Sequence, residues 1–114
     1  MESKKSLFLE TFGDSPHMKA LDFFLTFPGF DYSKTQVAAE TGISRITMEK
    51  IWVKLTETGL IRKTRTIGRA EMYCLNKQNP RVKALIELDL KLSKAYAEMQ
   101  APMKQKIKIR SLDY

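Results

Sequence analysis

Apolar residues recur at three- and four-residue steps in two segments of the first half of the chain, and a capped segment between them is also typical of a helix, so three helices are predicted. The first follows Ser15-Pro16, where the serine can cap the helix and proline tolerates its first position. The second spans residues 34–40 and is ended by Gly42, and the third spans residues 45–58. The predicted core face of the third helix consists of Met48, Ile51, Trp52 and Leu55.

After the third helix, the hydrophobic pattern changes from the three- to four-residue period of a helix to the two-residue period of a strand. Residues 60–67 and 71–76 are rich in residues that favour strands, and Gly68-Arg69 between them marks a turn. A β-hairpin is therefore predicted directly after the third helix. The alternation places four residues on one side of its first strand: Ile61, Lys63, Arg65 and Ile67.

A long apolar stripe runs through the C-terminal third of the chain. Asn79-Pro80 combines a cap with proline, and the helical spacing continues to about Gln100. The stripe is wider than one small domain is expected to cover, which predicts packing on the parent domain and on a second copy of the chain. Packing within a single chain is the alternative. The predicted dimer contacts are Leu85, Leu88, Leu92, Ala95, Tyr96 and Met99.

The two ends of the chain differ in composition from the middle. The N-terminal segment, residues 1–14, has an apolar stretch without a partner in the three-helix core, so we expect this segment to join the dimer interface. The stretch consists of Leu7, Phe8, Leu9 and Phe12. Within residues 101–114, positions 104–110 alternate cations with two isoleucines, which fits an added strand or a loose basic arm. As an arm, it could be an extension that contacts DNA or a disordered end. The predicted organisation places a folded domain at 15–78, a dimerisation helix at 79–100 and the basic tail after it.

Charge and cysteine content narrow the function. The 114 residues include 20 Lys and Arg against 13 Asp and Glu, a formal net charge of +7. This excess favours a polyanion but does not choose between DNA, RNA and an anionic lipid surface. The single Cys74 forms no internal disulfide and has no metal or redox spacing, so we expect a reducing cytoplasmic location and no metal. No apolar run approaches the roughly 20 residues that span a bilayer, so no membrane partner is expected.

The sequence lacks the groups of residues that catalysis requires. The sequence has no glycine-rich phosphate loop and no nucleophile with a matching histidine, and its carboxylates are isolated on predicted helix surfaces. We therefore expect no enzyme activity, no cofactor and no small-molecule ligand.

The stretch QVAAETGISRITMEKI, residues 36–51, resembles the helix-turn-helix of prokaryotic winged-helix transcriptional regulators, and residues 60–76 resemble their wing. A small residue at Ala38 lets the two helices cross closely, and Gly42 can take the turn between them. The phrase FGDSP at residues 12–16 further resembles archaeal members of the group. The resemblance implies an α+β, mainly α, winged helix-turn-helix fold: a three-helix core plus a β-hairpin wing, with a long C-terminal helix.

The same resemblance implies that the third helix enters the major groove of double-stranded DNA while the wing follows the phosphate backbone. Arg45 and Lys50 could donate to guanine and Glu49 could accept from cytosine. The backbone amides of Lys34 and Thr35 could hold a phosphate. The complete set of candidate DNA contacts is Lys34, Thr35, Ser44, Arg45, Ile46, Thr47, Glu49, Lys50, Lys54, Arg62, Lys63, Arg65 and Arg69.

Charge is unevenly divided between these two elements. The wing carries four cations against one carboxylate, whereas the third helix carries three against two, so affinity is expected mainly from the wing and tail. We expect a homodimeric, sequence-specific regulator of transcription. Two alternatives remain: a segregation or architectural protein that coats DNA, and a winged-helix module that binds protein instead of DNA.

Overall fold

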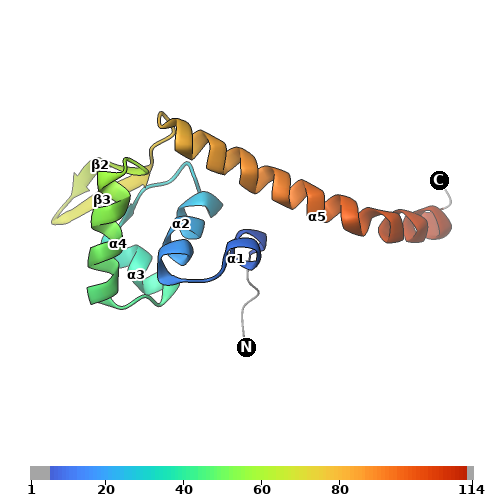
Figure 1. Cartoon of the computed structure of the whole chain (residues 1–114), viewed down its shortest axis with the longest axis horizontal. Helices are drawn as coiled ribbons and strands as arrows, with labels where there is room; N and C mark the ends of the chain where they lie inside the picture. The colour runs from blue at the N-terminus through green and yellow to red at the C-terminus, as the bar shows by residue number, and fades with distance from the viewer. Residues whose placement is uncertain (1–5, 113–114) are drawn as a thin grey trace.

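The computed structural model describes residues 6–112, with the side chains of residues 6–99. Figure 1 shows the short helices and the hairpin gathered at one end, and one long helix leaving them. The three strands form an antiparallel sheet in the order β1-β3-β2. The elements are α1 (Leu7–Phe12), α2 (Pro16–Thr26), β1 (Tyr32–Ser33), α3 (Lys34–Thr41), α4 (Arg45–Glu57), β2 (Ile61–Ile67), β3 (Ala70–Leu75) and α5 (Pro80–Leu112).

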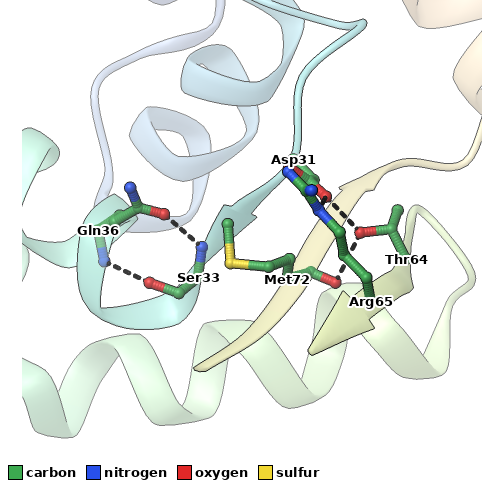
Figure 2. Close-up of polar contacts among 6 residues, drawn as sticks. All are labelled: Asp31, Ser33, Gln36, Thr64, Arg65 and Met72. Atoms are coloured by element: carbon green, nitrogen blue, oxygen red, sulfur yellow. Dashed lines mark hydrogen bonds and ion pairs between the residues drawn. The ribbon is translucent and has the colours of Figure 1, made fainter. Parts of the chain in front are cut away.

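Serine caps begin the helices of the helix-turn-helix at the predicted positions. The side chains of Ser33 and Ser44 each accept a hydrogen bond from the backbone N–H three residues later. Gln36 returns the contact, because its side-chain oxygen accepts from the Ser33 backbone N–H (Figure 2). Gly42 has a φ of 76° and turns the chain from α3 into α4. The serine contacts fix where the two helices begin, and Gly42 sets the turn between them.

One hydrophobic core joins the helix-turn-helix, the sheet and both flanking helices. The predicted core face of α4 is buried in full, and α5 contributes Val82. Phe8 of α1 is only 2% exposed and belongs to the same core. The prediction that the N-terminal segment has no partner in the core is therefore wrong for this residue. Because α1 contacts both α2 and α5, the long helix α5 covers part of α1.

The hairpin has the predicted strands but not the predicted alternation. Lys63 pairs with Tyr73, whereas Arg65 pairs with Met72, so Thr64 is one residue too many on β2. Neighbouring residues on a strand point to opposite faces, and Lys63 and Arg65 therefore do not share a side. The prediction of one face from Ile61 to Ile67 is wrong because a hydrophobic pattern does not encode a register shift.

The last helix begins as predicted and ends later. The backbone N–H of Arg81 donates to the Asn79 side chain, and the helix continues to Leu112 instead of ending near Gln100. The Lys, Gln and Ile residues of this segment all tolerate a helix, and the segment continues the helix that precedes it. The strand and loose-arm predictions for the tail are therefore wrong up to residue 112, and residues 113–114 lie outside the described residues. None of the described helices is long and apolar enough to cross a membrane.

Candidate nucleic-acid interface

The outward face of α4 is open to solvent at the end of the molecule from which α5 points away (Figure 1). Its exposed side chains include Arg45, Ile46, Glu49, Lys50 and Lys54, which were all predicted to lie there. Ile46 is 74% exposed.

Two residues on α4 differ from what the sequence predicted: Val53 is exposed on the outward face, and Thr47 is engaged with Ser44. Val53 is 52% exposed and was missed, although its spacing four residues after Glu49 places it on the same face. Thr47 is only partly exposed, and its hydroxyl oxygen accepts a hydrogen bond from Ser44 at 3.0 Å. Both hydroxyls are therefore engaged at the start of the helix.

An ion pair lies between two hollows beside α4. The Nζ atom of Lys34 is 2.9 and 2.8 Å from the two carboxylate oxygens of Glu49. Both residues line a hollow of about 460 Å³ between α4 and the wing, and a second of about 490 Å³ between α3 and α4. The pair joins the first helix of the helix-turn-helix to the second on their exposed side.

A third hollow, of about 360 Å³, lies between the wing and the N-terminal end of α3. It is lined by Ser33, Lys34, Thr35 and, from the hairpin, Arg69. The N-terminal end of a helix carries partial positive charge and attracts anions. The sequence predicted Thr35 and Arg69 as separate contacts, and the fold brings both to the same hollow.

The candidate cations fall into a paired and an unpaired group. Lys34 pairs with Glu49, Lys63 lies 3.5 Å from Glu71, and Arg65 pairs with Asp31. Among the described residues, the remaining five candidates form no ion pair and are exposed: Arg45, Lys50, Lys54, Arg62 and Arg69.

Two titrating groups near this surface have displaced pKa values. Hydrogen bonds from Arg65 and from Thr64 hold the pKa of Asp31 below its usual range, so this carboxylate stays charged at neutral pH. Burial and the nearby Lys54 lower the pKa of His17, so the histidine adds no charge at neutral pH. The excess positive charge of the surface therefore comes from Lys and Arg.

The junction of α1, α2 and α5 holds a further hollow of about 350 Å³. Asp22 and Asp89 line it, and Asp22 accepts a hydrogen bond from Ser6 Oγ at 2.9 Å. Burial raises the pKa of both carboxyl groups, and the nearby Asp89 raises that of Asp22 further. Within residues 6–99, neither carboxylate has a cation partner, and no group of three or more His, Cys, Asp or Glu could hold a metal ion.

No protein-family profile and no curated protein matches the sequence. Several solved structures share its fold, including these three. HlyU from Vibrio cholerae has a TM-score of 0.54 and 20% identity, covering 75% of this chain and 88% of that chain. The apo form of the ZitR C30AH42A mutant from Lactococcus lactis has a TM-score of 0.60 and 18% identity, covering 92% and 84%. A probable transcriptional regulator from Pseudomonas aeruginosa has a TM-score of 0.53 and 21% identity, covering 93% and 82%.

The fold is a winged helix-turn-helix, mainly helical with a small antiparallel sheet, as the sequence predicted. At identities near 20% this likeness establishes the architecture alone. The three similar structures come from bacteria, so the predicted resemblance to archaeal members finds no support among them.

Proposed function

We propose that this protein is a homodimeric cytoplasmic regulator of transcription that binds double-stranded DNA in a sequence-specific manner. In this proposal α4 enters the major groove and the hairpin follows the phosphate backbone. One observation carries it: the outward face of α4 is open, and the five unpaired cations lie on it and on the adjacent wing. Unpaired cations are free to replace the counterions of a polyanion.

Sequence would be read from the exposed face of α4. Arg45 and Lys50 are long unpaired donors that suit the acceptors of guanine, and Glu49 suits the cytosine amino group. The exposed apolar side chains of Ile46 and Val53 suit thymine methyl groups. Ser44 and Thr47 bind each other, so we assign them to shaping the start of the helix.

Phosphates would be held on both sides of that helix. The hollow at the N-terminal end of α3 is lined by Lys34, Thr35 and Arg69, whose backbone amides and guanidinium would donate to a phosphate. Glu71 also lines it and is paired with Lys63. Arg62 lines the hollow between α4 and the wing and is exposed. Lys54 adds a charge near the end of α4. Such contacts position the protein without selecting a sequence.

The dimer is supported by the distal part of α5. Leu85 packs against its own core, so it is the least suited of the predicted interface residues. Leu88 and Leu92 are half-buried and Ala95 is exposed, whereas Tyr96 is 48% exposed and Met99 79%. A two-fold pairing of this helix would place the two reading helices about 34 Å apart, or a multiple of that, on a palindromic site.

Truncation after Ser93 tests the dimer without opening the core, because Val82 and Leu85 remain in place. The truncated chain is expected to sediment as a monomer and the full chain as a dimer. A dimer that survives the truncation would exclude the residues after Ser93 from the interface, since Leu88 and Leu92 remain in the truncated chain.

Selection from a random duplex pool, followed by affinity measurements across salt concentrations, tests the function. The logarithm of the binding constant should fall with the logarithm of salt concentration by ~0.9 for each phosphate neutralised. Binding that is steep in salt but indifferent to sequence would favour the coating protein. Absence of DNA binding would favour the protein-interaction module.

A further inference from the structure

One carboxylate ties the wing to the loop between α2 and β1. Asp31 Oδ2 accepts hydrogen bonds from Thr64 Oγ1 at 2.6 Å and from Arg65 Nε at 2.9 Å. Its Oδ1 accepts from Arg65 Nη2 at 3.2 Å, so the guanidinium binds both carboxylate oxygens (Figure 2). The Asp31 side chain is 16% exposed and that of Arg65 62%. The contact joins residues more than 30 positions apart in the sequence.

This tie coincides with the register shift of the hairpin. Thr64 is the residue that the β2–β3 pairing leaves over, and its hydroxyl also lies 3.2 Å from the carbonyl oxygen of Met72. An extra residue in a ladder bends the strand and increases its local twist. Asp31 therefore holds the hairpin at the point where its direction changes.

We propose that Asp31 is the positioning residue of the wing. By holding Thr64 and Arg65 it sets the direction of the hairpin, and with it the distance of Arg62 and Arg69 from α4. In this proposal Arg65 is engaged in the pair and makes no phosphate contact, which differs from the role predicted from the sequence. This inference rests on the proposed binding of DNA.

Two properties of the pair support a positioning role. An arginine fork on a carboxylate fixes orientation as well as proximity, which a lysine cannot do. A hairpin already oriented before binding avoids the ordering cost that a mobile wing would add to each DNA complex. Wing cations presented at a fixed distance from α4 would then meet the backbone on either side of one groove.

The sign of one substitution separates positioning from plain electrostatics. Asp31→Asn removes a negative charge beside the surface that would face DNA. If Asp31 acted only through its charge, this variant would bind DNA more tightly, because repulsion from the phosphates would be lost. If Asp31 positions the wing, the same variant binds more weakly.

The test compares Asp31→Asn, Arg65→Ala and Arg65→Lys with the wild-type chain, using a duplex chosen by selection. Each variant is expected to weaken binding about five-fold, including the lysine, which keeps the charge but loses the fork. The double variant Asp31→Asn/Arg65→Ala should bind no more weakly than either single variant, because both remove one interaction. The matched control Glu57→Gln removes a carboxylate of α4 that has no ion partner among the described residues, and should bind as well as the wild type or slightly better.

The salt dependence supplies a second readout. Arg65→Ala should keep the wild-type slope, since no phosphate contact is lost, whereas loss of a contact would make the slope shallower by ~0.9. Tighter binding by Asp31→Asn, wild-type affinity of Arg65→Lys, or that shallower slope would each overturn the proposal.

Hydrogen exchange of the free protein tests the tie without DNA. Backbone amides of β2 and β3 should exchange faster in Asp31→Asn and in Arg65→Lys, with α4 unchanged. Unchanged exchange in the hairpin would overturn the positioning role even if DNA binding is confirmed. Failure of the wild-type chain to bind any duplex would instead overturn the proposed function, and the exchange result would still decide whether Asp31 holds the wing.

Discussion

Two carboxylates beside α4 and the wing are paired with cations, whereas two at the junction of α1, α2 and α5 are partly buried without one among the described residues. Beside α4 and the wing, Asp31 and Glu49 each bind a cation within 3 Å. At the junction of α1, α2 and α5, Asp22 and Asp89 lie close together, and neither has a cation partner in the described part of the chain. Hydrogen bonds lower the pKa of Asp31, whereas burial raises the pKa of Asp22 and Asp89.

At the wing, ion pairs position side chains, whereas at the junction apolar packing stabilises the fold. At the wing, acid-base pairs hold selected cations in place and leave others free for a partner. At the junction, desolvated carboxylates oppose folding, and the buried side chains of Phe8 and Val82 offset them.

The largest expected effect is at the junction. Phe8→Ala should lower the free energy of unfolding by about 3 kcal/mol, because it removes a fully buried ring and leaves a cavity. Denaturant unfolding measures the change, with Phe12→Ala as the matched control, since that ring is 47% exposed on the same helix. A loss no larger than that of the control would show that α1 adds little to the core.

The wing should respond in binding instead of stability. Replacing Arg62 and Arg69 together by Ala should weaken binding to all duplexes by at least about ten-fold and make the salt slope shallower by about 1.8, since two phosphate contacts are lost. The unfolding midpoint should not move. Replacing Lys83 and Lys91 of α5 by Ala is the control, with the same change in charge. An equal loss of affinity in both pairs would point to a general charge effect.

The pair on α4 should affect specificity more than affinity. Glu49→Ala should reduce the preference for one base several-fold in a site library, because an acceptor for cytosine is lost. Lys34→Ala should change the preference at the same position, since Lys34 holds that carboxylate. A uniform loss across the library, or changes at unrelated positions, would contradict this assignment.

The smallest expected effect is from Asp89→Asn. Burial raises the folded-state pKa of Asp89 above its ordinary value of 3.8, so the charged form costs stability at neutral pH. The variant should therefore be more stable at pH 7 by under about 1 kcal/mol, because solvent screens a group this exposed. The gain should shrink as the pH falls through the raised pKa and disappear below the ordinary value of 3.8, where Asp89 is neutral in the folded and the unfolded chain. The charge of Asp31 has the opposite effect on stability. Because the folded-state pKa of Asp31 is lowered, its charged form favours folding at pH values above its ordinary pKa.

Local contacts explain what the sequence predicted well. Each serine cap bonds to a backbone amide three residues away, and Gly42 acts at its own position, so both are readable from a short stretch. The open face of α4 follows from helical periodicity. The tie of Asp31 to Arg65 and the place of Phe8 depend on residues brought together only by the fold. For the same reason, charge counting could name the cations of the wing but could not tell paired from unpaired ones.

The length of α5 has a consequence for the spacing of the sites that a dimer accepts. This helix runs as one element from Val82, fixed in the core, to a distal half that extends beyond α1 (Figure 1). In the proposed dimer it acts as a lever arm. A small change in the angle at which two copies cross at the far end would shift both reading helices relative to each other, so an element that touches no base would set the half-site separation.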